Sequence, residues 1–385
     1  MSQFVDGNAI SLLQNGEHYF PALEAAIHGA VKTVFLETYI FCPDAVGYRI
    51  AAALMAAAAR GVAVQVLVDG FGGRDFVGQL MPELVANGVH VLIYRREVRR
   101  FSINRHRLRR LHRKLAVIDD RIAFVGGINI LDDYDSGRLA APRHDYAVRI
   151  EGPLLRPICA TVYHIWSLAS WTSFRRRVLL PDLSRVCVRP VGDVRAAFLV
   201  RDNLLHRHDI EEAYLAAIAR AEQEIVIACA YFFPGRRFRQ ALVAAAGRGV
   251  KVVLLLQGMA DHPLLAYATR ASYPFYLAHR IHLYEYDVSY LHAKVAVVDR
   301  QWATVGSSNI DIFSFLLARE ANVVVDDPVF AKRLYSSLRQ AIRKGARRLR
   351  HKHWRRLSWF QRGLSWGAYY LVRMLIGIAG FSREH

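Results

Sequence analysis

Two stretches of the chain share one frame, LHRKLAVIDDRIAFVGGIN at Leu111–Asn129 and LHAKVAVVDRQWATVGSSN at Leu291–Asn309. Both read His-x-Lys-x4-Asp-x6-Gly-[Gly/Ser]-x-Asn, with the histidines at positions 112 and 292. Chance would not repeat a frame of this length with every polar position kept. The pattern therefore predicts a duplicated structural unit.

The repeat extends beyond the frame. Residues 32–43 (KTVFLETYIFCP) match residues 223–234 (QEIVIACAYFFP), and residues 59–70 (ARGVAVQVLVDG) match residues 247–258 (GRGVKVVLLLQG). Near-continuous apolar runs that alternate with helical stretches are typical of α/β sheets covered by helices on both faces. We predict an α/β protein of two halves, each a mixed sheet flanked by helices, packed as a pseudo-dimer with one shared active site.

Composition limits the kind of partner. The chain has 385 residues, 53% of them hydrophobic, which is enough for two cores and excludes disorder. Its four cysteines form neither a CxxC pair nor a His/Cys cluster, and the start MSQFVDGNAI has no features of a secretory signal. The formal net charge of +19 indicates a polyanionic partner, either nucleic acid or an anionic lipid surface.

The first part of each frame predicts a strand that holds the candidate catalytic side chains. His112 and Lys114 share one strand face by period-two alternation, and a turn then returns the chain antiparallel. This hairpin places small residues and an amide opposite the histidine and lysine, where the backbone could approach a tetrahedral anion. The expected phosphate-binding residues are Gly126, Gly127 and Asn129 in the first half and Gly306, Ser307 and Asn309 in the second.

Carboxylates that could orient the histidines lie further along each half. Asp119 is seven residues from its histidine, about 23 Å along an extended strand, so it cannot orient that ring. We expect Asp119 and Asp299 to hold their turns or to pin the halves together. Asp145 and Glu320 are better candidates, because a histidine that acts as base or nucleophile usually has a carboxylate on its other nitrogen.

Two histidines that face one phosphate suit phosphodiester exchange. One imidazole attacks phosphorus and forms a phosphohistidine, while the other protonates the leaving alkoxide and later deprotonates the incoming alcohol. His112 and His292 would fill these roles, and Lys114 and Lys294 would stabilise the charged oxygens. We expect no metal and no cofactor, because no carboxylate cluster of the two-metal type accompanies the frames.

The largest difference between the two halves is a basic insertion in the first half. The first half carries 12 additional residues just before its frame, within Arg95–Arg110, a segment with eight arginines. A solvated loop is the ordinary interpretation of such a charge run. Its position next to the frame favours a basic rim around the site. The expected substrate rim consists of Glu37, Tyr39, Tyr231, Arg105, Arg107, Arg109 and Arg110.

The C-terminal tail has a different character. Nine Lys and Arg residues lie within positions 341–362, and an apolar, aromatic stretch follows at Leu364–Gly380. This stretch is short for a membrane span and contains Arg373, which favours an interfacial or re-entrant helix. A helix docked on the domain is the alternative. The expected organisation is an N-terminal half at 1–155, a linker helix and connection at 156–200, a C-terminal half at 201–345 and a membrane-associating tail at 346–385.

The duplicated HxKxxxxD frame with its trailing Gly and Asn resembles the phospholipase D superfamily. The strings GNAISLLQNGEHYFPALEAAI, FLETYIF, YFFPG and NIDIFSFLLAREANVVV further resemble bacterial cardiolipin synthases of the B type. The resemblance implies transfer of a phosphatidyl group from one phosphatidylglycerol to another, with release of glycerol, and His112 as the nucleophile. The catalytic set that it implies is His112, Lys114, Asp119, His292, Lys294 and Asp299.

Several alternatives remain beside this expectation. The first frame has Gly127 where the family more often has Ser, and the two acids differ, Asp145 and Glu320. A phospholipase D-type phosphodiesterase or transphosphatidylase acting on another phospholipid, a nuclease, and a non-catalytic polyanion-binding protein would each fit part of the pattern. The tail favours a lipid surface over nucleic acid. We expect an anionic phospholipid substrate and a peripheral location on the cytoplasmic face of the inner membrane, with the oligomeric state open.

Overall fold

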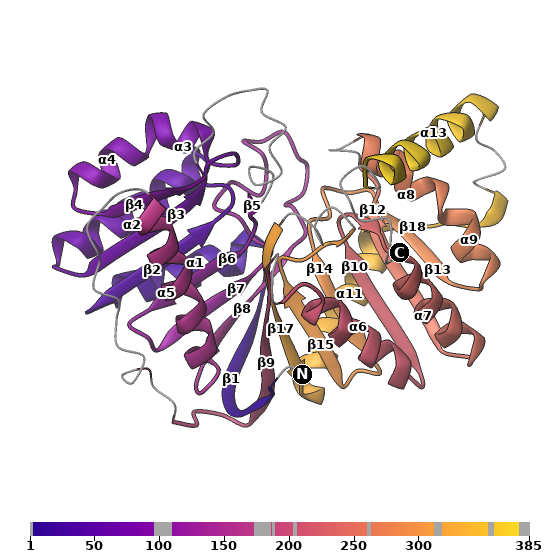
Figure 1. Cartoon of the computed structure of the whole chain (residues 1–385), viewed down its shortest axis with the longest axis horizontal. Coiled ribbons are helices and arrows are strands. Elements are labelled where there is room, and N and C mark those ends of the chain that lie inside the picture. The colour runs from indigo at the N-terminus through magenta and orange to yellow at the C-terminus, as the bar shows by residue number, and fades with distance from the viewer. Residues whose placement is uncertain are drawn as a thin grey trace.

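The structure is a computed structural model. It describes residues 3–95, 110–172, 186, 189–202, 206–259, 263–311, 318–352 and 358–376. Figure 1 shows two halves side by side, with the first half in indigo to magenta and the second in red to yellow.

The first half is built on a mixed sheet. Its strands run in the spatial order β1-β8-β7-β6-β2-β3-β4, with β2, β3 and β4 parallel and the others antiparallel. The elements are β1 (Val5–Gln14), α1 (Asn15–His28), β2 (Thr33–Thr38), α2 (Ala45–Ala59), β3 (Ala63–Asp69), α3 (Arg74–Gln79), α4 (Met81–Ala86), β4 (His90–Tyr94), β5 (Arg110–Leu111), β6 (Lys114–Ile118), β7 (Ile122–Gly126), β8 (Tyr146–Glu151) and α5 (Leu155–Thr172).

The second half repeats this order as β9-β17-β15-β14-β10-β12-β13, and the short strand β18 extends its outer edge. The duplication predicted from the sequence is thus a duplication of topology. Its elements are β9 (Val194–Arg201), α6 (Asp209–Arg220), β10 (Glu224–Cys229), β11 (Phe232–Phe233), α7 (Arg236–Gly247), β12 (Lys251–Gln257), α8 (Pro263–Ala271), α9 (Tyr273–Ala278), β13 (His282–Tyr286), β14 (Lys294–Val298), β15 (Trp302–Gly306), β16 (Ile310–Asp311), β17 (Ala318–Asp326), α11 (Pro328–Gly345), β18 (Ala346–Arg348) and α13 (Trp359–Ile376).

The two half-sheets join into one continuous sheet. β1 and β9 occupy equivalent positions in the two halves and pair antiparallel at the junction, with Val5 opposite Ala196. Because the central pair is made of equivalent strands, it relates the halves by a pseudo-twofold axis. The part of the sheet that belongs to the second half begins with β9 at Val194, before residue 201, where we expected this half to begin.

Helices cover both faces of this sheet. On one face α5 and α11 contribute to a single core that spans both halves, with Trp166 and Leu338 among its buried residues. On the other face each half has its own core, under α1, α2 and α4 in the first half and under α6, α7 and α9 in the second. The shared core holds the two halves in a fixed relation. Ser337 on α11 of the second half adds hydrogen bonds to β1 and β8 of the first half.

The C-terminal helix α13 lies against α8 (Figure 1). A small apolar cluster joins them, formed by Ala368 and Val372 with Ala268 and Phe233. The other side of α13 is exposed. Within the described part of the chain, no helix is both long and apolar enough to cross a bilayer.

Candidate active site

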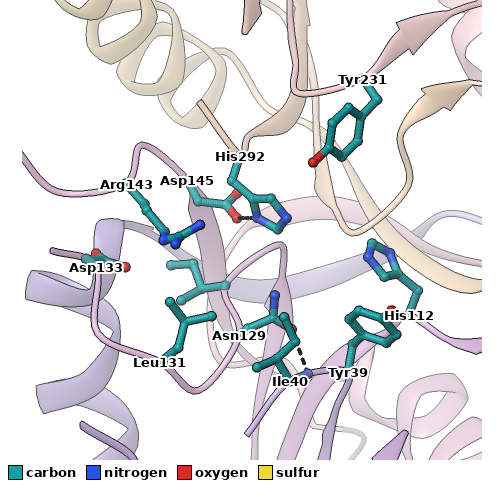
Figure 2. A pocket seen from close by; sticks show the side chains of 11 residues that line it. Tyr39, Ile40, His112, Asn129, Leu131, Asp133, Arg143, Asp145, Tyr231 and His292 are labelled. Carbon is teal, nitrogen blue, oxygen red and sulfur yellow. Dashed lines mark hydrogen bonds and ion pairs between the residues drawn. The ribbon is translucent and has the colours of Figure 1, made fainter. Parts of the chain in front are cut away.

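The histidines meet in one cavity between the halves. His112 precedes β6 and His292 precedes β14, so both lie at the edge of the sheet where β2 and β10 end. In α/β sheets, ligands bind at the carboxyl ends of the parallel strands. The cavity has a volume of about 320 Å³. Figure 2 shows the side chains around it. It is lined by Tyr39, Ile40, His112, Ile128, Asn129, Leu131, Asp133, Arg143, Asp145, Tyr231 and His292.

Each histidine is held by the acid of the opposite half. His112 Nδ1 lies 3.0 Å from Glu320 Oε1, and His292 Nδ1 lies 2.6 Å from Asp145 Oδ2. The two carboxylates are almost fully buried, whereas the imidazoles are 18% and 21% exposed toward the cavity. Asp145 and Glu320 thus contact the histidines, and each acid contacts the histidine of the opposite half. Each imidazole keeps Nε2 free to face a ligand.

The backbone repeats this exchange. The His112 N–H donates to the carbonyl of Arg319, the residue before Glu320, and the His292 N–H donates to the carbonyl of His144, the residue before Asp145. Main chain and side chain thus tie each histidine to the other half. Neither half alone would hold its histidine in this position.

The lysines lie beneath the histidines. Lys114 Nζ donates to the His112 carbonyl at 2.7 Å, and Lys294 Nζ donates to the His292 carbonyl. Both ammonium groups are buried, and Lys294 also lies 3.9 Å from Asp145 Oδ2. Their chains reach the histidine carbonyls because residues two apart share a strand face.

Burial and mutual charge set the protonation of the site. Burial, together with the nearby charge of Lys294, lowers the pKa of His292 to about 4, although Asp145 opposes this. Burial also lowers the pKa of His112, although Glu320 opposes this. At neutral pH, both resting imidazoles are therefore neutral.

The acids and the first lysine also have shifted pKa values. Burial opposes ionisation of Asp145, but Lys294 and His292 outweigh it and hold the Asp145 pKa below its ordinary value. For Glu320, burial is likewise outweighed, first by His112, and the pKa is lowered. Burial lowers the pKa of Lys114 to about 7. The site thus pairs ionised carboxylates with neutral, nucleophilic imidazoles.

The frame aspartates lie at the far end of their strands. Asp119 accepts hydrogen bonds from the backbone N–H groups of residues 31, 32 and 33, and Asp299 accepts from those of residues 222, 223 and 224. Each carboxylate holds the entry to the first parallel strand of its own half. All six hydrogen bonds stay within one half, which favours the local role over the alternative of pinning the halves together.

The small residues of the frame fit closely against the neighbouring strand. Gly126 pairs with Lys114, as the hairpin predicted, and an added Cβ there would lie 2.5 Å from the Ala147 backbone. At Gly306 an added Cβ would meet Asn322 at 2.2 Å. Asn129 lines the cavity and accepts from the Ile40 N–H, while Asn309 is buried beside Cys229. Sheet packing therefore already requires both glycines.

The expected rim is only partly at the cavity. Tyr39 and Tyr231 line it from opposite halves. The expectation for Glu37 is wrong: its side chain is buried and bonded to Arg113 at 2.6 Å, because β2 turns this position inward. Arg110 lies over the Phe71 ring and near Asp69, away from the cavity lining. Arg105, Arg107 and Arg109 lie outside the described residues.

Sequence reasoning missed several lining residues. Ile40, Ile128 and Leu131 supply apolar wall, and Asp133 and Arg143 supply charge at one end. Alternation could have found Arg143, which is two residues before Asp145 and so shares its face. Asp133 carried no such signal. Among the described residues, no group of three or more His, Cys, Asp or Glu side chains could hold a metal ion.

Known proteins resemble this chain over nearly its whole length. The family model described as "Cardiolipin synthase, PLD-like domain" matches residues 23–137 and 214–342. The cardiolipin synthase B proteins of Shigella flexneri and Escherichia coli (strain K12) are each 38% identical over 380 residues, covering 99% of this chain and 91% of theirs. The crystal structure of phosphatidylserine synthase from Haemophilus influenzae Rd KW20 shares the fold, with a TM-score of 0.70 at 13% identity, covering 97% of this chain and 95% of that one. The chain belongs to the cardiolipin synthase family with phospholipase D-like domains.

Proposed function

We propose that the protein is a cardiolipin synthase that transfers a phosphatidyl group from one phosphatidylglycerol to another and releases glycerol. The observation that carries this proposal is the single cavity in which both histidines meet, each backed by an ionised acid from the opposite half. Such an arrangement supplies a nucleophile and an acid/base group on two sides of one phosphate.

In the first half-reaction His112 Nε2 attacks the phosphorus of the donor lipid. The P–N bond forms as the bond to the glycerol oxygen breaks, and His292 gives its proton to that oxygen. The neutral resting state of both imidazoles suits the nucleophile. His292 gains its proton when the anionic phosphodiester enters, because nearby negative charge raises the pKa of an imidazole.

In the second half-reaction the headgroup hydroxyl of another phosphatidylglycerol replaces glycerol. His292 removes its proton, the alkoxide attacks phosphorus, and the bond to His112 breaks to give cardiolipin. Lys114 and Lys294 bond the histidine carbonyls and do not line the cavity, so their positive charge stabilises the charge that builds on the non-bridging oxygens through space. Asp119 and Asp299 have no part in these steps.

Lipid analysis tests this proposal directly. Purified protein incubated with phosphatidylglycerol vesicles should form cardiolipin and free glycerol in equal amounts, measured by mass spectrometry. Formation of phosphatidic acid alone would instead assign a phospholipase D-type hydrolase. A requirement for phosphatidylethanolamine would reassign the donor, and cleavage of DNA without action on lipid would assign a nuclease.

The exposed side of α13 supports a bilayer surface as the protein's location. Trp359, Phe360, Tyr370 and Met374 are between 54% and 83% exposed, although they are large and apolar. A basic segment precedes them in the chain, and each cation near an anionic bilayer adds about 1 kcal/mol of attraction. An interfacial helix with this pattern, docked on the domain by its other side, combines both interpretations of the tail. The cytoplasmic face of the inner membrane is the proposed location.

Serine at these four positions should lower binding to phosphatidylglycerol vesicles at least about tenfold, measured by co-sedimentation. Activity on a short-chain, water-soluble phosphatidylglycerol should stay within about twofold, because Ala368 and Val372 still dock the helix. The control variant places serine at Val31 and Val329, which lie outside α13 and are 72% and 77% exposed. Equal loss on soluble and vesicle substrate would reject the surface role.

A further inference from the structure

One end of the cavity is charged and belongs to the first half alone. Asp133 and Arg143 line this end, and the Arg143 N–H donates to the Asp133 carbonyl at 2.9 Å, which closes the loop between them. The loop is ordered by its own bonds, since Asp132 accepts from the N–H groups of Tyr134 and Ser136. This part of the cavity is therefore preformed.

Arg143 is fixed on the His292 side. Its neighbour Pro142 accepts from the hydroxyl of Ser289, and His144 on the other side bonds the backbone at both Tyr290 and His292. The Arg143 guanidinium lies 5.0 Å above the Tyr290 ring. Figure 2 shows Arg143, Asp145 and His292 following one another along the cavity, with His112 beyond His292.

The guanidinium has unused hydrogen-bonding capacity. Its Nε is buried without a hydrogen-bond partner in the described structure, and the ion pair between Arg143 and Asp135 is long at 3.9 Å. A buried donor without a partner is costly, so such a group indicates a ligand. Asp133 neutralises the guanidinium only in part, because burial raises the pKa of its carboxyl to about 7 even though Arg143 opposes this.

We propose that Arg143 binds the phosphate of the acceptor lipid, the phosphatidylglycerol whose hydroxyl approaches His292. This inference rests on the proposed function. Unlike water or a simple alcohol, the acceptor lipid carries its own phosphodiester. One glycerol unit separates this phosphodiester from the hydroxyl that attacks. A guanidinium beyond His292 can hold that phosphate by charge-assisted hydrogen bonds while His292 takes the hydroxyl proton. Positioning the acceptor in this way favours transfer over hydrolysis.

Among the residues that the structure describes, Arg143 is the only arginine or lysine that lines the cavity. Two residues before Glu320 the chain has Ala318, where the first half has Arg143 before Asp145. The acceptor site is thus one-sided, and it assigns the incoming lipid to His292 and the covalent intermediate to His112.

Competing acceptors test this assignment. Phosphatidylglycerol vesicles are offered with 1-butanol, and cardiolipin and phosphatidylbutanol are measured together. Both products share the donor and the covalent step, but only cardiolipin formation uses an anionic acceptor. Arg143→Gln should lower cardiolipin formation about ten- to a hundredfold, the range for a hydrogen bond to a charged group, and leave phosphatidylbutanol within about twofold. With soluble glycerophosphoglycerol as acceptor, its KM should rise at little change in kcat.

Two further variants sharpen the result. Arg143→Lys should recover part of the cardiolipin yield, because it keeps the charge. Arg149→Gln, which removes an arginine that pairs with Glu151 on β8 outside the cavity, should change neither product. An equal fall in both products, or a fall in neither, would overturn the acceptor role of Arg143. Wild-type protein that makes phosphatidylbutanol but never cardiolipin would instead reject the proposed function.

Discussion

The two halves use different acids to hold the opposite histidine, Asp145 in the first half and Glu320 in the second. In the second half, Ser307 donates its hydroxyl to Glu320, the acid that holds His112. In the first half, the matching positions are Gly127 and Asp145. A Cβ at Gly127 would lie 2.4 Å from the Asp145 carboxylate, so the shorter acid occupies the space that a serine side chain would need.

This comparison explains two departures from the family pattern as one. Aspartate reaches the opposite histidine only by lying close to its own half's backbone, and that requires glycine at 127. Glutamate is longer by one methylene, which leaves room for the serine. Residues 127 and 145 therefore form a matched pair, as do 307 and 320.

The largest expected effect tests whether the halves divide the chemistry. His112→Asn and His292→Asn should each lower transfer by roughly ten-thousandfold or more, because each removes one member of the nucleophile and acid/base pair. Acid-quenched wild type exposed to labelled lipid should carry the phosphatidyl group on His112. A label on His292 would exchange the roles of the two halves, and near-normal turnover of either variant would disprove a shared site.

The next effect compares the two acids. Asp145→Asn and Glu320→Gln should each lower activity about a hundredfold by releasing the opposite imidazole. Asp145 raises the pKa of His292, so its removal lowers that pKa further. Where protonated His292 is the general acid, the alkaline limb of the pH–rate profile should then move to lower pH in Asp145→Asn. An unmoved limb would mean that Asp145 acts on position alone.

The sequence predicted the contacts within each half and one shared site, but it did not predict that each acid contacts the histidine of the opposite half. The strand face shared by His112 and Lys114 and the pairing with Gly126 follow from local periodicity and hairpin geometry. The exchanged partners do not. His112 and Glu320 are 208 residues apart, and they meet because the β1–β9 pair and the shared core bring the halves together. Periodicity and hairpin geometry concern residues that are close in sequence, so they do not predict contacts between the halves.

The burial of Glu37 was also not predicted from the sequence. Glu37 lies next to the residues that lead to the cavity, so it resembled a rim residue, yet strand alternation turns it toward Arg113 in the interior. There burial raises the pKa of Glu37, and the Arg113 guanidinium opposes this. The charged end of the cavity was missed for a related reason: it comes from a loop with no repeat in the second half.

A smaller effect tests the matched pair itself. Gly127→Ser should lower activity about tenfold, because the added side chain displaces Asp145 from His292. Gly127→Ser with Asp145→Glu recreates the second-half arrangement and should recover most of that loss. A double variant no better than Gly127→Ser alone would show that the two positions are not coupled. Ser307→Gly, which removes a hydroxyl without crowding, is the control and should cost less.

The smallest effect on catalysis is expected where the halves are most alike. Asp119 and Asp299 each accept three backbone hydrogen bonds and each sit in a left-handed turn, with φ of 51° and 50°. Asparagine tolerates that conformation but weakens the bonds, since it loses the charge and one acceptor oxygen. Either Asp→Asn variant should lower the free energy of unfolding by about 1–3 kcal/mol, measured by urea denaturation, because these bonds are partly exposed.

Under conditions where both variants are folded, turnover should stay within about threefold of wild type, because neither carboxylate reaches the cavity. The resemblance to the family counts these aspartates among the active-site residues, so kinetics separate the two interpretations. A hundredfold loss of turnover in folded Asp119→Asn would restore the catalytic reading. Equal destabilisation by the two variants, with turnover kept, would show that the duplicated aspartate is retained in each half to hold the entry to its first parallel strand.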